Sequence, residues 1–263
     1  MQIYTHTLPG GAQLIGYLRD RTVEMPAFNT RPAILILPGG GYAWCSRREA
    51  DPVAMQFLQA GYNVFTLYYT CRSDETVPAL RWQPLIDAAG AILHIRRNAE
   101  QFGTDPAKIA ICGFSAGGHL ALSGAVLDIP GETAQQRPNA VILGYPVVTA
   151  GEFAHRGSFV QLAGSEDAAA QQVFTLEDKV NSDTPPVFVW HTMEDKTVPV
   201  ENTLLLLAAL RRAGVPCEAH LFEKGAHGTS ISTAEVDAAD PHRAHWVALC
   251  LEWLGETFGF KLS

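Results

Sequence analysis

The sequence contains no long apolar run and no leader-like start. Nowhere do roughly 18 apolar residues follow one another, so a membrane-spanning helix is not expected. The first residues, Met-Gln-Ile-Tyr, are neither basic nor part of an apolar stretch, so no signal peptide is expected either. We therefore expect a soluble protein that has no membrane partner and resides in the cytoplasm.

Cysteine and basic residues are also scarce. The five cysteines lie far apart, are odd in number and form no C-x-x-C pair, which argues against a disulfide framework and a zinc site. No metal is expected, and a reducing compartment fits this usage. The 19 Lys and Arg residues are outnumbered by 27 Asp and Glu residues, for a formal net charge of −8. Because phosphate binding needs a basic face, a nucleic-acid partner is not expected.

The composition is that of an ordinary globular protein. Apolar residues make up 47% and charged residues 17% of the 263 positions. Since single α/β domains routinely run to about 200–250 residues, one domain over residues 1–263 is expected.

Apolar runs of strand length alternate with helical patterns along the chain. The elements expected in the first half are a hairpin at 3–18, strands at 33–37, 62–69 and 109–112, and helices at 50–60 and 82–101. Strands at 140–146, 187–191 and 217–222 and helices at 199–212 and 243–257 follow. This alternation predicts an α/β fold: a mostly parallel sheet with an N-terminal antiparallel hairpin and helices on both faces.

Two later segments carry more specific expectations. Residues 147–184 form a connection longer than usual and of mixed polarity, which favours a small cap or lid insertion over the site. The helix at 199–212 is apolar nearly all round, so we expect it to be deeply packed.

The pentapeptide Gly113-Phe114-Ser115-Ala116-Gly117 is the strongest local motif. It stands between an apolar strand and a helix, where a G-x-S-x-G turn holds a serine in a sharp, exposed conformation. Ser115 is therefore the candidate nucleophile.

Earlier in the chain, Pro38-Gly39-Gly40-Gly41-Tyr42 ends a buried strand. We interpret these glycines as a loop that brings backbone N–H groups beside the serine.

A serine nucleophile needs a histidine base, and the histidine needs a carboxylate that fixes its tautomer. Asp195 follows a late strand in the expected order, with Glu194 as its close rival. Among nine histidines, His227 follows the last strand in a glycine-flanked loop and is chosen as the base. His191 precedes the acid, which is the wrong order, and His119 is expected to be a packing residue behind the site.

Together these motifs, with the segment Tyr145-Pro146 and residues 151–158, resemble the α/β-hydrolase esterases. Among these, the chain most resembles the small bacterial acetyl-esterase/lipase-like proteins related to acetylxylan esterases and xylanases. Pro38 stands where lipase relatives carry a histidine, so a place in the lipase branch is not implied. The resemblance implies an α/β-hydrolase fold with these roles: Ser115 as nucleophile, Asp195 as acid, His227 as base, and N–H groups of Ala116 with Gly40 or Gly41 as the oxyanion hole.

The activity that the resemblance implies is hydrolysis of a short-chain carboxylic ester, with an acetyl group on a sugar hydroxyl as the leading substrate. The partner would be a small-molecule ester, and no cofactor is needed. The aromatic residues Tyr42, Trp44 and Trp82 either wall the substrate pocket or pack between cap and sheet, and both interpretations stay open. An oligopeptidase-like hydrolase and a non-catalytic binding protein are the alternatives. The oligomeric state is also open, a homodimer being one option.

Overall fold

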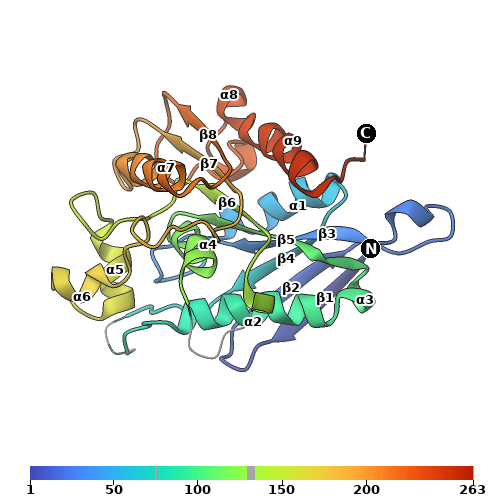
Figure 1. Ribbon diagram of the computed structural model, residues 1–263, viewed down its shortest axis with the longest axis horizontal. Helices are drawn as coiled ribbons and strands as arrows, with labels where there is room; N and C mark the ends of the chain where they lie inside the picture. The colour runs from blue at the N-terminus through green and yellow to red at the C-terminus, as the bar shows by residue number, and fades with distance from the viewer. Residues whose placement is uncertain (75, 77, 129–133, 263) are drawn as a thin grey trace.

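The computed structural model describes residues 1–74, 76, 78–128 and 134–262, and its centre is one eight-stranded sheet in the order β1-β2-β4-β3-β5-β6-β7-β8 (Figure 1). The strands are β1 (Gln2–Thr7), β2 (Gln13–Leu18), β3 (Arg31–Leu37), β4 (Asn63–Tyr68), β5 (Thr104–Phe114), β6 (Ala140–Gly144), β7 (Val187–Thr192) and β8 (Cys217–Phe222). The β1–β2 and β2–β4 pairs are antiparallel and all others parallel. The predicted fold class is thereby confirmed.

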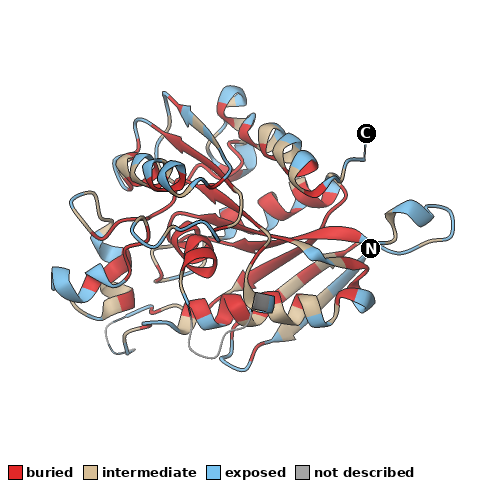
Figure 2. Ribbon diagram, in the orientation of Figure 1, coloured by how far each residue is buried: buried red, intermediate tan, exposed pale blue. Residues whose placement is uncertain are grey.

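Helices cover both faces of this sheet. They are α1 (Asp51–Gln59), α2 (Gln83–Arg97), α3 (Ala99–Phe102), α4 (Ala116–Val126), α5 (Arg156–Ala163), α6 (Ala168–Gln172), α7 (Glu201–Ala213), α8 (Pro241–Ala244) and α9 (Trp246–Phe258). One hydrophobic cluster joins the sheet to α2, α4 and α7, and a second joins its other face to α1 and α9. Figure 2 shows the sheet as the buried layer between them.

The central strands are apolar on both faces because both faces are covered. In β3, Leu35 and Leu37 belong to one cluster and Ile34 and Ile36 to the other. This explains why its sequence is a continuous apolar run rather than an alternating one. Because β3, β5, β6, β7 and β8 run parallel, their carboxyl ends meet at one edge of the sheet. The loops that follow these strands can therefore converge there.

Two helices differ from expectation. The predicted helix at 82–101 is divided at Asn98 into α2 and α3. The helix at 199–212 is not deeply packed: in α7 only one side is buried, and Leu204 is 43% exposed. The reason is its place in the outer layer of an open sheet, where a helix has one face against the strands and the other in water.

The segment 147–184 contains α5 and α6 and packs beside the start of α2. Backbone N–H groups of Leu80 and Arg81 donate to the carbonyls of Gln161 and Leu162 at 3.1 and 2.8 Å.

Within the described residues, none of the helices combines the length and the apolar content that crossing a bilayer requires.

Candidate active site

Ser115 occupies the turn between β5 and α4. Its backbone has φ 54° and ψ −120°, a conformation that non-glycine residues rarely adopt and that stores strain. A Cβ on Gly117 would lie 2.1 Å from the carbonyl oxygen of Leu37, and one on Gly113 would lie 2.1 Å from the carbonyl oxygen of Gly117. Both glycines are therefore required, because β5, α4 and the end of β3 approach one another so closely that no side chain fits between them.

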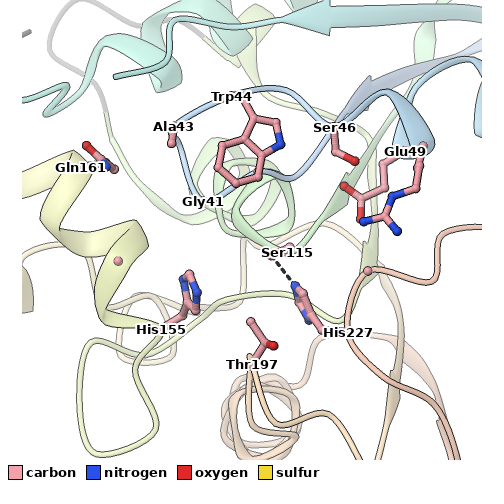
Figure 3. A pocket seen from close by; sticks show the side chains of 14 residues that line it. Gly41, Ala43, Trp44, Ser46, Glu49, Ser115, His155, Gln161, Thr197 and His227 are labelled. Atoms are coloured by element: carbon pink, nitrogen blue, oxygen red, sulfur yellow. Dashed lines mark hydrogen bonds between the residues drawn. The ribbon is translucent and has the colours of Figure 1, made fainter. Parts of the chain in front are cut away.

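Three predicted side chains come together at the carboxyl edge of the sheet. The Nε2 atom of His227 lies 2.8 Å from Oγ of Ser115, and its Nδ1 lies 2.7 Å from Oδ2 of Asp195. Figure 3 shows His227 turned toward Ser115 from the loop after β8. With Nδ1–H donating to Asp195, Nε2 is left as an acceptor for the serine proton.

Asp195 is held by four donors. Its Oδ1 accepts the backbone N–H groups of Thr197 and Val198, both at 2.9 Å. Its Oδ2 accepts from His227 and also from Nε2 of His191 at 3.3 Å. Although burial alone would raise the pKa of the Asp195 carboxyl, hydrogen bonds from His191, His227 and Val198 hold that pKa well below its ordinary value. The carboxylate is thus ionised at neutral pH.

His191 precedes the acid in the chain, which argues against it as the base, and the structure places it against Asp195 instead. It is fully buried, with Nδ1 2.8 Å from Oγ1 of Thr203 and Nε2 3.0 Å from the carbonyl oxygen of Val198. Its contact with Asp195 orients the carboxylate. No signal in the sequence separated this role from that of an ordinary strand histidine.

The loop after β3 presents backbone N–H groups beside the serine. Gly40 and Gly41 have positive φ values of 124° and 64°. A Cβ on Gly40 would lie 2.1 Å from the carbonyl oxygen of Trp44, so this tight turn requires glycine. In the described part of the chain, no acceptor takes the N–H groups of Gly40, Gly41 or Ala116. Ala116 is the first residue of α4, where helix N–H groups have no partner within the helix.

A cavity of about 350 Å³ opens over these groups. Its wall includes Gly40, Gly41, Trp44, Ser115, His155 and His227, together with Gln161 and Thr197 (Figure 3). Trp44 is 63% exposed and lines the cavity. This position agrees with the interpretation of Trp44 as part of the pocket wall.

The other two predicted substrate-binding residues, Tyr42 and Trp82, are not among the residues that line this cavity, which favours the packing interpretation for them. Tyr42 is buried, and its hydroxyl lies 2.8 Å from Nδ1 of His119. Trp82 packs on the ring of Phe174 with centroids 4.9 Å apart. The contacts of both residues are thus packing contacts, Tyr42 with α4 and Trp82 with the 147–184 segment. His119 is the packing residue expected, with Nε2 2.8 Å from the carbonyl oxygen of Phe174.

A buried acid that no sequence motif indicated, Glu49, also lies at the cavity wall. Glu49 accepts the N–H of Gly39 at 2.7 Å and the hydroxyl of Tyr145 at 2.6 Å. That hydroxyl accepts the N–H of Ser230 at 2.9 Å, and the Tyr145 ring packs edge-on against His227. Burial raises the pKa of Glu49, opposed by its bonds from Tyr145 and Gly39. The glycine loop and the histidine loop are therefore tied to each other through one buried network.

No cluster of three or more His, Cys, Asp or Glu side chains suited to a metal ion occurs among the described residues. The groups gathered here, a hydroxyl, an imidazole, a carboxylate and free N–H donors, are those that acyl transfer uses.

Comparison with known proteins finds relatives that are named as esterases and hydrolases. A family model described as BD-FAE matches residues 23–144, and one described as the prolyl oligopeptidase family matches residues 91–260. An endo-1,4-beta-xylanase B of Butyrivibrio fibrisolvens is 38% identical over 235 residues, covering 84% of this chain and 35% of the relative. An acetylxylan esterase of Xylanibacter ruminicola is 30% identical over 232 residues, covering 85% of this chain and 45% of the relative. The chain thus spans less than half the length of these two curated relatives.

A solved structure matches over nearly its whole length. The acetyl ester-xyloside bifunctional hydrolase from Caldicellulosiruptor lactoaceticus superimposes with a TM-score of 0.81 at 34% identity, over 97% of this chain and 90% of that one. The chain belongs to the α/β-hydrolase superfamily. Within it, the chain belongs to the prolyl oligopeptidase family, whose model matches more than half of its residues. It is also similar to proteins named as an acetylxylan esterase and an acetyl ester-xyloside hydrolase.

Proposed function

We propose that this chain hydrolyses carboxylic esters by nucleophilic attack of Ser115, with His227 as the base and Asp195 as the orienting acid. The observation that carries the proposal is the continuous pair of hydrogen bonds, 2.8 Å from Ser115 to His227 and 2.7 Å from His227 to Asp195. A serine hydroxyl is a poor nucleophile at neutral pH, and this pair supplies the base that it needs.

The reaction proceeds through an acyl-enzyme. His227 takes the proton of Ser115 Oγ as that oxygen attacks the ester carbonyl, and the ionised Asp195 stabilises the imidazolium. The N–H groups of Ala116 and of Gly40 or Gly41 donate to the oxyanion, each contributing about 2.7–4 kcal/mol to barrier lowering. His227 then protonates the leaving alcohol. Water, activated by the same imidazole, releases the acid.

The substrate we propose is a short acyl ester, with acetyl on a carbohydrate as the leading choice. A cavity of about 350 Å³ is near the small end of ligand sites and suits a small acyl group with part of its alcohol. The exposed Trp44 offers an aromatic face to a sugar ring. The relatives named for acetylxylan and acetyl ester-xyloside substrates support this choice.

Residues 147–184 are proposed as a small cap within a single domain, because they supply His155 and Gln161 to the cavity wall.

All five cysteines are free, which supports a reducing compartment such as the cytoplasm.

Peptide cleavage is the second candidate, favoured by the match of residues 91–260 to the prolyl oligopeptidase family. The same triad can hydrolyse an amide, so the two activities are distinguished by comparing turnover of an ester with turnover of a peptide. A non-catalytic binding role is less well supported, because binding alone would need none of the hydrogen bonds between Ser115, His227 and Asp195.

The direct test compares the wild type with Ser115→Ala on p-nitrophenyl acetate and on a p-nitroanilide peptide. Loss of the nucleophile should lower kcat on the ester by at least about 10³-fold while the melting temperature stays close to that of the wild type. Anilide turnover exceeding ester turnover would instead establish the peptidase, and an inert wild type would contradict both enzymatic proposals.

A further inference from the structure

One wall of the cavity carries two polar side chains that the proposed triad does not use. His155 is the N-cap residue of α5, and Gln161 lies further along the same helix. Figure 3 shows both on the opposite side of the cavity from His227. The carbon Cε1 of His155 lies 3.9 Å from the position that a Cβ on Gly41 would occupy. The imidazole therefore stands next to the loop proposed to bind the oxyanion.

The local contacts of His155 define its tautomer. Its Nδ1 lies 2.9 Å from Oγ of Ser158 and accepts the backbone N–H of Ser158 at 3.4 Å, which is the N-cap bond of α5. Because a backbone N–H can only donate, Nδ1 is the acceptor and the proton of the neutral ring is on Nε2. Ser158 is fully buried, so this arrangement is held firmly.

The ring stays uncharged at neutral pH. Burial lowers the pKa of His155, the charge of His227 lowers it further, and Asp195 opposes the shift. Among the described residues no acceptor takes the Nε2 proton. His155 thus presents one neutral N–H donor at the cavity.

Gln161 supplies a second donor on this wall. Its Oε1 accepts from Nη1 of Arg72 at 3.1 Å, which fixes the orientation of the amide. The amide NH₂ group is then the part left for a ligand.

An acetyl ester has few atoms that such donors could bind. The carbonyl oxygen is served by the backbone N–H groups of Ala116 and of Gly40 or Gly41 in the proposed mechanism, and the acetyl methyl accepts no hydrogen bond. The remaining acceptors are on the alcohol side of the ester. A simple aliphatic or aromatic alcohol offers none beyond the ester oxygen, whereas a sugar offers neighbouring hydroxyl and ring oxygens.

We propose that His155 is a specificity-determining residue whose Nε2–H donates to a hydroxyl or ether oxygen of the leaving alcohol, so that the site selects esters of polyhydroxylated alcohols. This inference rests on the proposed esterase function. Gln161 assists from the same wall. Leaving these donors without an acceptor is what disfavours alcohols that lack such oxygens.

Two substitutions separate the donor from the helix cap. In His155→Asn the amide oxygen can take the place of Nδ1, and asparagine is a good N-cap, but the cavity donor is lost. In His155→Gln the amide nitrogen can reach the place of Nε2, so the donor is kept. The two substrates are a mono-acetylated methyl xyloside, which has free neighbouring hydroxyls, and p-nitrophenyl acetate, which has none.

For His155→Asn we expect kcat/KM on the xyloside acetate to fall about tenfold more than kcat/KM on p-nitrophenyl acetate, mainly through KM. His155→Gln should recover most of that difference. Melting temperatures of both variants report whether the α5 cap is intact.

Three results would overturn the inference: equal losses on the two substrates, no loss on either, or His155→Gln as selective against the sugar ester as His155→Asn. Equal losses on the two substrates would mean that His155 acts on the ester carbonyl oxygen or on the stability of the fold, and not on the alcohol. Failure of the esterase proposal itself would look different, because the wild type would then turn over neither ester.

Discussion

At the scale of single residues, the most informative group is Asp195. Its Oδ1 is held by the N–H groups of Thr197 and Val198, so in Asp195→Asn the new amide nitrogen would face Nδ1 of His227. Nδ1 would then have to accept, the proton would move to Nε2, and Ser115 would face a donor instead of a base. We expect kcat on p-nitrophenyl acetate to fall by about 10⁴-fold with little change in melting temperature.

Glu194 provides the matched control in the same loop. It is exposed, and in the described part of the chain its carboxylate accepts a hydrogen bond from the N–H of Gly225, at 3.2 Å. Glu194→Gln should keep kcat within about twofold of the wild type, since exposed substitutions away from the site are usually mild. If Glu194→Gln were the inactive variant and Asp195→Asn the active one, the assignment of the acid would be wrong.

At the scale of elements, the crossing of β3, β5 and α4 depends on Gly117. An alanine there would place its Cβ 2.1 Å from the carbonyl oxygen of Leu37 and 2.4 Å from that of Pro38, both backbone atoms that cannot move aside cheaply. We expect Gly117→Ala to lower the free energy of unfolding by at least about 3 kcal/mol and to remove most activity. Urea unfolding followed by circular dichroism measures this loss.

Gly124, on the same helix, is the control for helix propensity. A Cβ at this position meets only Cδ1 of Leu85, at an ordinary 4.0 Å. Gly124→Ala should therefore raise the free energy of unfolding by about 0.5–1 kcal/mol. Similar losses for both alanine variants would show that close backbone approach is not what excludes a side chain at position 117.

At the scale of the whole molecule, buried His119 makes stability depend on pH. Burial lowers the pKa of His119 from 6.5 to about 4, against the opposing bond to the Phe174 carbonyl. Between these values the unfolded chain binds a proton that the folded chain does not, so the free energy of unfolding falls as pH falls. From pH 7.5 to 4.5 this one group should cost about 2.5 kcal/mol.

The variant His119→Gln isolates that contribution, because glutamine is polar but does not titrate. Urea unfolding of both proteins at pH 7.5 and 4.5 gives two pH-dependent losses, and the loss of the variant should be smaller by about 2–3 kcal/mol. Equal losses would mean that His119 has the same pKa in the folded and the unfolded chain. That result would contradict the effect expected from its burial and its contacts with Tyr42 and Phe174.

Much of the fold could be predicted because strand and helix patterns are local. The apolar run of β3 and the G-x-S-x-G turn at Ser115 reflect rules that act over a few residues. The order of the loops along a parallel sheet then indicated Asp195 and His227, since successive strands end at the same edge.

What the amino-acid order alone determined was thus the alternation of elements, the serine turn and the loops that could meet it. Only the tertiary structure decided which way side chains face and what lies opposite them. Trp44 reaches the cavity while Tyr42, two positions away, is buried against His119. Glu49 and His191 became buried partners of the site, and α7 kept one side in water. These outcomes depend on contacts between residues far apart in the chain, which local patterns do not encode.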